Sequence, residues 1–535
     1  MKRFGVMLDM SRNAVMKPEE VKKFVVVLKS LGYNMIQLYT EDTYEVENEP
    51  YFGYLRGRYS ATELQDIVSY CNAIGVEVIP CVQTLAHLNQ IFRWGAYAPI
   101  NDTADILLVE EDRTYELIEN MFKSLRKSFT TEYVHIGMDE AHMLGLGRYL
   151  DKHGLKNRFE ILNKHLEKVI ALAEKYDFKP IMWSDMFFRL GNEGEYYPQN
   201  PKISQEVIDI TPKNVGLVYW DYYHTEKSMY DGMFAAHKRF DNEIWFAGGA
   251  WTWSGFAPGN KFTLETMTPA MQSAKEQGIE NIFVTMWGDN GKECSFYSVL
   301  PSLFAIRQIY DGETDMQQIK RRFFEITGED YDAMIALDIP NYVGGNTICT
   351  GTVCKHMLYA DPFFGALDTT VRPGVTEEYR QHAKTLSAYA KTSKNYAYLF
   401  ESAAALCDLL SVKYDLGVRT RAAYQAKDKA ALKEVVKDYG LVLEKLQYFY
   451  DKFSALWYKE NKPHGFDVQD IRLGGLMQRL KACQNRLSAY LGGSLEEISE
   501  LGEELLDWFG GGTKINEIDT PCVNSWVHAS SVNIL

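Results

Sequence analysis

The sequence predicts an α/β fold, a (β/α)₈ (TIM) barrel followed by a C-terminal α-helical domain. Strand-like and helix-like segments alternate over roughly the first 310 residues, which is typical of βαβ units and a parallel sheet. Eight strand-like runs can be counted, and the alternation ends after about residue 312. We therefore expect a barrel over residues 1–312, a transitional segment packed on it over 313–375, and a helical domain over 376–535.

The eight expected strands are apolar along most of their length, as strands buried on both faces should be. They span residues 3–9, 33–39, 76–82, 132–137, 178–184, 215–220, 244–250 and 281–287. An open doubly wound sheet usually has fewer strands and a glycine-rich nucleotide turn after the first one. Here Met10-Ser11-Arg12-Asn13 follows the first strand, so a closed barrel is the better interpretation.

The helices between these strands have recognisable ends. Residues 18–31 begin with Pro18 and stop at Gly32, and residues 62–74 stop at Gly75. Beyond the barrel, long helical stretches are expected over 377–410, 427–460 and 471–491. Their apolar residues recur at helical spacing, which predicts a bundle packed on the barrel.

Composition narrows the class of function. The formal net charge of −15 disfavours binding to nucleic acid or to an anionic membrane surface. No apolar run approaches the length of about 20 residues that a membrane helix needs. The N-terminal apolar run is too short for the apolar region of a signal peptide, and the acidic residue Asp9 already ends it. A cytoplasmic protein is therefore expected.

The cysteines indicate neither a metal site nor a disulfide framework. Eight are scattered along the chain, and the closest pair, Cys349 and Cys354, fits no common metal-binding spacing. We expect free thiols in a reducing compartment, and no metal or other cofactor.

Functional side chains gather where the expected strands end. Barrel enzymes place their catalytic groups at the carboxyl ends of the strands. Any one such residue has a plain structural explanation, because a strand-end carboxylate often caps a helix and a lone Trp is usually core. Together they predict one site, built from Asp9, Arg12, Glu41, Asp42, Gln83, His87, Asp139, Glu140, Trp183, Asp185, Trp220, Asp221, Tyr222, Trp251, Trp253, Trp287 and Asp289.

The most specific motif is His135-Ile136-Gly137-Met138-Asp139-Glu140. It resembles the His-x-Gly-x-Asp-Glu signature of glycoside hydrolase family 20, the β-N-acetylhexosaminidases. The resemblance covers most of the barrel, including Met7-Leu8-Asp9 with Arg12, Gln83-Thr84-Leu85-Ala86-His87 and three tryptophans. The helical C-terminal region, with no small α/β domain ahead of the barrel, resembles the bacterial branch of exo-acting N-acetylglucosaminidases.

The resemblance implies a substrate-assisted reaction on an oligosaccharide or glycoconjugate, in which the 2-acetamido oxygen attacks the anomeric carbon. Glu140 would be the general acid and base, and Asp139 would orient the acetamide and stabilise the developing charge. Further substrate contacts are expected from the aromatic residues Trp183, Trp220, Trp251, Trp253 and Trp287, and from Gln83. Tyr222 or Tyr223 would donate to the acetamide oxygen, and the sequence does not decide between them.

Other roles follow from the same resemblance. His87 is expected to pair with Glu41 near Glu140, unless it is a structural histidine, and His135 is expected behind the site. The family's sugar-binding arginine would fall at Phe4, one residue from Arg3. Asp9, Arg12, Asp289 and Glu293 are therefore the candidates that replace it.

Two alternatives and several questions stay open. A two-carboxylate retaining glycosidase would use Asp289 or Glu293 as nucleophile, about 5–5.5 Å from Glu140. A non-catalytic carbohydrate-binding barrel is the second alternative, since the fold alone does not decide function. The sequence leaves open the gluco or galacto preference, a homodimer, and whether His464-Gly465-Phe466-Asp467 reaches the barrel or only joins two helices.

Overall fold

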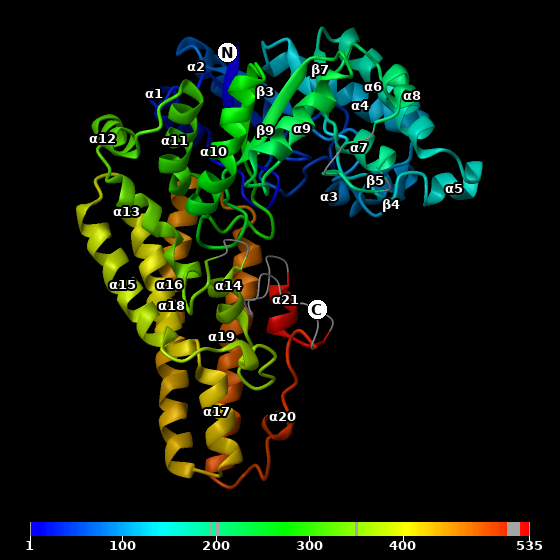
Figure 1. Cartoon of the computed structure of the whole chain (residues 1–535). Coiled ribbons are helices and arrows are strands. Elements are labelled where there is room, and N and C mark those ends of the chain that lie inside the picture. Colours follow the sequence, from blue (N-terminus) through cyan, green and yellow to red (C-terminus); the bar gives the residue numbers. More distant parts are fainter. Residues whose placement is uncertain are drawn as a thin grey trace.

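The computed structural model describes residues 2–192, 194–198, 201, 203–347, 351–510 and 525–533. Within them, eight parallel strands close into a barrel in the order β1-β10-β9-β8-β7-β6-β3-β2. Figure 1 shows the barrel at one end of the molecule with helices around it. These strands are β1 (Arg3–Asp9), β2 (Met35–Tyr39), β3 (Glu77–Cys81), β6 (Tyr133–His135), β7 (Lys179–Trp183), β8 (Gly216–Trp220), β9 (Ile244–Gly249) and β10 (Asn281–Met286). The predicted barrel is confirmed.

Helices cover the outside of the barrel as predicted. The main ones are α1 (Pro18–Ser30), α2 (Ala61–Ala73), α4 (Asp112–Ser128), α6 (Arg158–Lys175), α9 (Lys227–Lys238), α10 (Asn260–Glu276) and α11 (Leu300–Asp311). The start of α2 shows why the chain turns helical there. The Ser60 hydroxyl accepts from the Glu63 amide while the Glu63 carboxylate accepts from the Ser60 amide, which satisfies two backbone donors that the helix leaves unpaired.

The loops at the carboxyl ends of the strands carry structure that the alternation did not predict. The loop after β3 contains α3 (Asn89–Phe92), the 3₁₀ helix η1 (Gly95–Ile100) and the hairpin of β4 (Asn101–Thr103) and β5 (Ile106–Leu107). α5 (Arg148–His153) follows β6, and the short helices α7 (Asp185–Gly191) and α8 (Gln205–Ile210) follow β7. A short 3₁₀ helix, η2 (Phe296–Val299), precedes α11.

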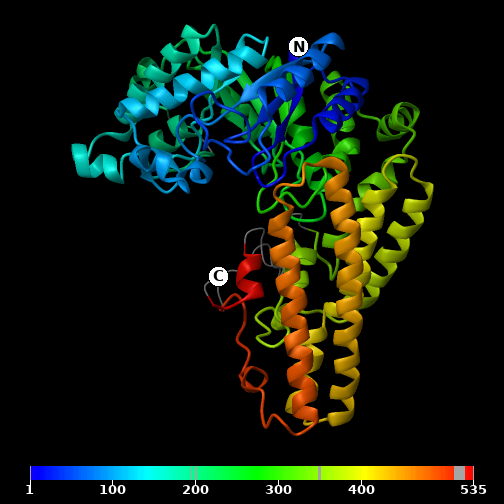
Figure 2. The ribbon, with the colours of Figure 1, turned by 180° about the vertical axis from the view of Figure 1, so that it is seen from behind.

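The rest of the described chain is helical. It comprises α12 (Met316–Thr327), α13 (Tyr331–Ile335), η3 (Ala336–Asn341), α14 (Val353–Tyr359), η4 (Asp368–Thr370), α15 (Val375–Thr392), α16 (Ala397–Lys413), α17 (Leu416–Gln425), α18 (Lys429–Glu460), α19 (Phe466–Leu491), α20 (Ser499–Gly502) and α21 (Trp526–Ser530). α15 to α19 form an elongated bundle that projects away from the barrel (Figures 1 and 2).

One predicted helical stretch is in fact two helices. The sequence predicts a helix over all of 377–410, but α15 ends at Thr392 and α16 begins at Ala397. The Glu329 carboxylate accepts from the Ser393 hydroxyl at 2.9 Å, from the Lys394 amide at 3.1 Å and from the Asn395 amide at 2.7 Å. The Lys394 and Asn395 amides therefore donate to Glu329 and not to carbonyls of the preceding helical turn. A residue far away in the sequence thus interrupts the helix.

The bundle contacts the barrel at the carboxyl ends of the strands. Met16, in the loop after β1, forms an antiparallel bridge with Asn461 in the turn between α18 and α19. A Cβ on Gly57 would lie 2.9 Å from the His464 Cβ. The 464–467 segment therefore reaches back to the barrel, which answers the question that the sequence left open.

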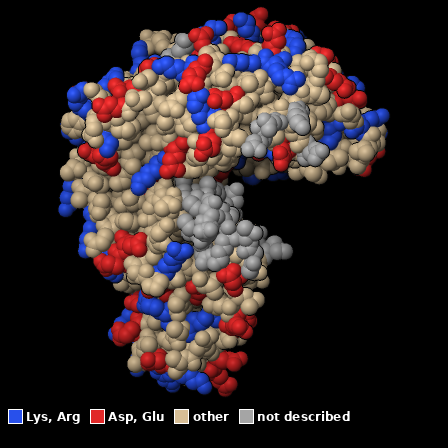
Figure 3. Space-filling view, in the orientation of Figure 1, with Lys and Arg blue, Asp and Glu red and all other residues tan. Residues whose placement is uncertain are grey.

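The surface charges are mixed in sign, and the described cysteines are free thiols. On the described part of the face in Figure 3, acidic and basic side chains are interspersed and neither sign forms a continuous patch. No helix in the described ranges is long and apolar enough to cross a membrane. Six cysteines are buried free thiols, whereas Cys349 and Cys522 lie outside the described residues.

Candidate active site

A pocket opens among the carboxyl ends of the barrel strands, with about 500 Å³ of space that is partly open to solvent. Each residue that lines it is one that the sequence analysis selected: Arg12, His87, Asp139, Glu140, Trp183, Trp220, Tyr222, Tyr223, Trp253, Trp287 and Asp289. The structure thus brings together side chains from seven strand ends.

Two neighbouring carboxylates diverge at the end of β6. The strand stops at His135, and Gly137, Met138 and Glu140 have φ of 72°, 71° and 50°. A Cβ on Gly137 would lie 2.0 Å from Gln83 Oε1, so only glycine fits there. The left-handed turns direct the Asp139 side chain inwards, where it is 11% exposed, and leave the Glu140 side chain 41% exposed.

Asp139 is held by two side chains from the loop after β3. Gln83 Nε2 donates to Asp139 Oδ1 at 2.8 Å, and His87 Nε2 lies 3.2 Å from Asp139 Oδ2. Burial alone would raise the pKa of Asp139, but His87 and the hydrogen bond from Gln83 together lower that pKa. Burial would likewise lower the pKa of His87, yet Asp139 raises it to about 10. The two groups therefore form an ion pair at neutral pH.

Glu140 faces the open side of the pocket among several charged groups. Its backbone amide donates to Asp185 Oδ2 at 3.0 Å, its Oε2 lies 3.8 Å from His87 Nε2, and its Oε1 lies 3.9 Å from Arg189 Nη2. Burial and the Asp139 carboxylate raise the pKa of Asp185. Sequence reasoning missed Arg189, although its position one helical turn after Asp185 was a usable signal.

Aromatic rings form most of the pocket wall. Trp183 is buried and lies 6.2 Å from Trp287 between ring centroids. Tyr222 stacks on Trp220 at 5.2 Å and an interplanar angle of 26°. Tyr222 is buried, whereas Tyr223 is 47% exposed.

Trp251 lies behind this wall and does not line the pocket. It is buried, stacks on Trp253 at 4.4 Å, and donates from Nε1 to the Tyr222 carbonyl at 3.1 Å. The expectation that Trp251 contacts substrate is not supported, because it contacts Trp253 and Tyr223, which line the pocket, and does not line it itself. Trp251 therefore supports the aromatic wall from behind.

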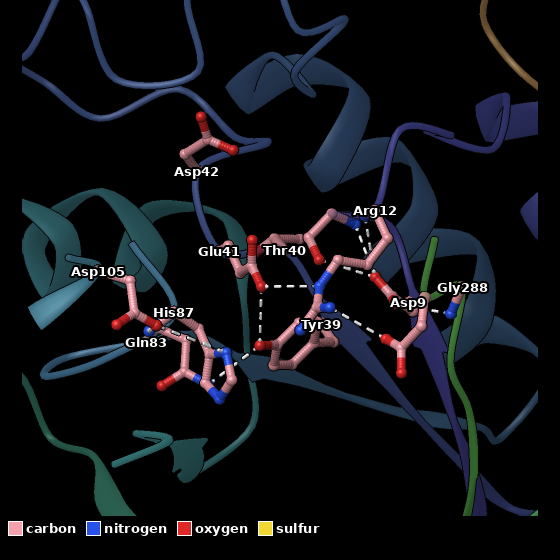
Figure 4. Close-up of polar contacts among 12 residues, drawn as sticks. Asp9, Arg12, Tyr39, Thr40, Glu41, Asp42, Gln83, His87, Asp105 and Gly288 are labelled. Carbon is pink, nitrogen blue, oxygen red and sulfur yellow. Dashed lines mark hydrogen bonds and ion pairs between the residues drawn. The ribbon is translucent and has the colours of Figure 1, made fainter. Parts of the chain in front are cut away.

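Side chains from the loops after β1, β2 and β3 form a polar rim, and Figure 4 shows Arg12, Glu41 and Gln83 among them. Arg12 donates from Nε to Glu41 Oε1 at 3.1 Å and from Nη1 to Asp289 Oδ1 at 3.0 Å. The Tyr39 hydroxyl donates to Glu41 at 3.0 Å and accepts from Gln83 Nε2 at 3.0 Å. A hydrogen-bonded chain therefore joins Asp139 to Asp289 around the pocket.

Asp9 and Gln83 support the pocket from outside its lining. Asp9 Oδ1 accepts from the Ser11 amide at 2.9 Å, and Asp9 Oδ2 accepts from the Gly288 amide at 2.8 Å. Asp9 thus ties the loop after β1 to the loop after β10. The Phe4 and Arg3 positions lie at the other end of the barrel, where Arg3 pairs with Glu77 at 2.7 Å.

Glu293 was wrongly expected at the pocket. Its side chain is 1% exposed and pairs with Lys355 Nζ at 2.6 Å and with Arg472 Nη1 at 3.3 Å, both from the helical region. The chain turns away at Gly291, which has a φ of 117°, and carries Glu293 outward. Sequence proximity to Asp289 could not reveal this turn.

His87 and Glu41 influence each other's pKa, but no hydrogen bond or ion pair joins these two residues directly. Glu41 is bound to Arg12 and Tyr39, while His87 is paired with Asp139 and its backbone amide donates to Asp105 Oδ2 at 2.9 Å. His135 is buried against Trp183, with 4.4 Å between ring centroids, behind the pocket as expected. Asp105 was missed, because it belongs to the hairpin turn that the sequence did not predict.

Comparison with known proteins assigns both parts of the chain. Residues 3–230 match the model of the glycosyl hydrolase family 20 catalytic domain, and residues 329–516 match that of the Glycoside Hydrolase 20C C-terminal domain. Hexosaminidase D of Bos taurus is 26% identical over 210 residues, covering 37% of this chain and 56% of its own length. Beta-hexosaminidase 3 of Arabidopsis thaliana is 23% identical over 307 residues, covering 54% of this chain and 52% of its own length.

The chain thus spans about half the length of these curated relatives. Among solved structures, the chitobiase of Flavobacterium johnsoniae aligns with 99% of this chain and 77% of its own, at 15% identity and a TM-score of 0.47. The two family matches agree with the barrel, with the motif at the end of β6 and with the helical region that follows. This chain belongs to glycoside hydrolase family 20.

Proposed function

We propose that this protein is an exo-acting β-N-acetylhexosaminidase that removes terminal, non-reducing β-linked N-acetylglucosamine with retention of configuration. N-acetylgalactosamine is the alternative sugar. The observation that carries the proposal is the divergence of Asp139 and Glu140 at the mouth of an aromatic pocket. One carboxylate is enclosed and ion-paired, and the other faces solvent, so the two suit different tasks.

In the proposed first step, the acetamide oxygen of the substrate attacks the anomeric carbon as Glu140 protonates the departing glycosidic oxygen. Asp139, kept ionised by His87, accepts the acetamide N–H and stabilises the positive charge of the oxazolinium-like intermediate. Glu140 then takes a proton from the water that opens this ring. The open side of the pocket, where Glu140 lies, suits both a departing group and an entering water.

The remaining lining residues have roles in binding. Trp183, Trp220 and Trp287 enclose the acetamide and exclude water from it, which strengthens its interaction with Asp139. The hydroxyl of Tyr222 or Tyr223 donates to the acetamide oxygen. Arg12 and Asp289 bind hydroxyls of the terminal sugar, and Glu41 orients the Arg12 guanidinium.

The two-carboxylate alternative has less support. Glu293 is buried against two cations and does not line the pocket, and Asp289 is paired with Arg12. A nucleophilic carboxylate needs to reach the anomeric carbon. The enclosed pair of Asp139 and His87 favours the acetamide as nucleophile instead.

The test compares an aryl β-N-acetylglucosaminide with the matching aryl β-glucoside, which has a hydroxyl at C2. We expect kcat to fall far more than binding weakens, because the glucoside lacks both the nucleophile and the group that Asp139 orients. A thiazoline mimic of the intermediate should bind far more tightly than the free sugar. The matching galactosaminide settles the sugar preference.

The rival makes the opposite prediction. An activated 2-fluoro sugar should then label Asp289 or Glu293 covalently, which intact-mass measurement would detect. Such an adduct, or comparable kcat for the glucoside, would overturn the proposed mechanism.

A further inference from the structure

Three side chains of the helical region hold the loop that follows β10. Gln469 Nε2 donates to the Gly291 carbonyl at 2.9 Å, and Arg472 Nη1 donates to the Asn290 carbonyl at 2.6 Å. Lys355 Nζ donates to Glu293 Oε2 at 2.6 Å. We call Lys355, Gln469 and Arg472 the clamp. Its members come from α14 and α19, and the loop that it holds carries Trp287 and Asp289 into the pocket.

The fit between clamp and loop is close. A Cβ on Gly291 would lie 2.5 Å from Arg472 Nη1 and 2.9 Å from Gln469 Nε2, so the backbone packs directly on the two donors. The side chains of Lys355 and Glu293 are each 1% exposed. A buried ion pair is sensitive to geometry, because each charge has lost its hydration and depends on its partner.

The same helical hairpin holds the loop that follows β1. The Lys462 amide donates to the Val15 carbonyl at 2.8 Å, and the Lys17 amide donates to the Glu460 carbonyl at 3.0 Å. A Cβ on Gly465 would lie 2.1 Å from the Asn13 carbonyl oxygen. The turn between α18 and α19 thus packs against the residues that directly follow Arg12.

These two loops meet in the pocket. Arg12 and Asp289 are 277 residues apart in sequence, and their side chains form an ion pair of 3.0 Å on the polar rim. We propose that Lys355, Gln469 and Arg472 are positioning residues of the active site, and that the helical region sets the Arg12–Asp289 pair for the hydroxyls of the terminal sugar. The proposal rests on the proposed function, because it assigns the pair to sugar binding.

The clamp should act on binding and not on the chemical step. Asp139 and Glu140 lie at the end of β6, and their contacts come from Gln83, His87, Asp185 and Arg189. Neither carboxylate contacts a member of the clamp. A displaced Arg12–Asp289 pair would weaken hydroxyl recognition in the ground state and the transition state alike, which raises KM and leaves kcat nearly unchanged.

Gln469→Leu tests this most cleanly, because it removes one neutral donor and leaves no unpaired buried charge. Gln484→Leu is the matched control. Gln484 lies on the same helix and donates from Nε2 to the Val436 carbonyl of α18 at 2.9 Å, away from the barrel. Both variants are assayed as full chains on an aryl β-N-acetylglucosaminide and on its 3-deoxy and 4-deoxy analogues.

For Gln469→Leu we expect kcat/KM on the full sugar to fall about five- to tenfold through KM, the size of one lost hydrogen bond. The loss should shrink on at least one deoxy analogue, because that substrate no longer uses the displaced pair. Gln484→Leu should match the wild type on all substrates. Arg472→Met, which removes the bond to Asn290, should repeat the pattern of Gln469→Leu.

Several results would contradict the proposed role of the clamp. The inference is overturned if Gln469→Leu and Gln484→Leu behave alike, or if kcat falls while the deoxy analogues lose as much as the full sugar. Amide hydrogen exchange in residues 288–293 gives a readout that does not depend on activity, and Gln469→Leu should accelerate it. A wild type that is inactive on the glycoside would overturn the proposed function alone, whereas unchanged exchange in the variant would overturn the clamp.

Discussion

Asp139 and Glu140 are neighbours in the chain with very different surroundings. Asp139 is enclosed and contacts Gln83 and His87, whereas Glu140 is 41% exposed and contacts the protein mainly through its backbone amide. These surroundings suit the two roles proposed for them, an ionised carboxylate at Asp139 and a proton donor and acceptor at Glu140. A continuing strand would point these two side chains to opposite faces. The left-handed residues that end β6 let both of them line one pocket.

Replacing Glu140 with Gln should abolish proton transfer and leave binding nearly intact. We expect kcat to fall by about 10²–10⁴-fold on an alkyl glycoside, and by less on an aryl glycoside whose phenol leaves without protonation. Glu132→Gln, an exposed residue just before β6 that pairs with Lys179, is the control and should retain wild-type kinetics. Equal losses on both kinds of leaving group would show that Glu140 is not the general acid.

The ion pair of His87 and Asp139 should make stability depend on pH. The folded state raises the pKa of His87 from 6.5 to about 10, so its contribution is complete below pH 6.5 and is lost as the pH rises through 10. His87→Gln should therefore cost about 3–5 kcal/mol at pH 6, as for a broken buried ion pair, and less at pH 10. Urea unfolding at both pH values measures this.

His153→Gln is the matched control, because His153 is exposed on α5. Its effect on the free energy of unfolding should be small at both pH values. A His87→Gln cost that stays constant from pH 6 to pH 10 would mean that the imidazole is not charged in the folded protein.

Residue-level prediction succeeded where local sequence carries the chemistry. The polar and aromatic residues that follow the predicted strands include all the residues that line the pocket. It failed where a distant partner decides the direction of a side chain. Glu293 follows Asp289 by four residues, yet Lys355 and Arg472 hold it outside the pocket. No residue near Glu293 in the sequence indicates that these two cations lie beside it.

At the scale of elements, the strands were predictable because a strand buried on both faces must be apolar throughout. The first strand had the predicted bounds, but the others were predicted one to three residues too long, for example 132–137 against the observed Tyr133–His135, where the apolar Ile136 continues into the turn. The β4–β5 hairpin was missed because its strands are two and three residues long. The break between α15 and α16 was missed because Glu329, far away in sequence, creates it.

At the scale of the whole molecule, barrel and helical region share a buried interface. Phe256, from the loop after β9, contacts Phe449 and Phe453 of α18 with 5.3 Å between ring centroids in each pair. Glu460 of α18 accepts from the Ser295 hydroxyl at 2.6 Å and from the Tyr398 hydroxyl at 2.8 Å. Apolar contact and satisfied polar groups together favour unfolding as one unit, because opening the interface would expose both.

Lys355→Met tests this coupling, because it keeps the side-chain volume and leaves Glu293 without its closest cation. Breaking a buried ion pair should lower the free energy of unfolding by about 3–5 kcal/mol. The control Lys320→Met breaks a partly exposed pair with Asp332 on the surface and should cost no more than about 1 kcal/mol.

Hydrogen exchange in increasing urea reports the unfolding free energy of each peptide separately. If the two regions unfold together, peptides from β1 and from α18 should lose stability equally in Lys355→Met. A loss confined to α18 would mean that the helical region unfolds on its own, and that the barrel does not depend on it for stability.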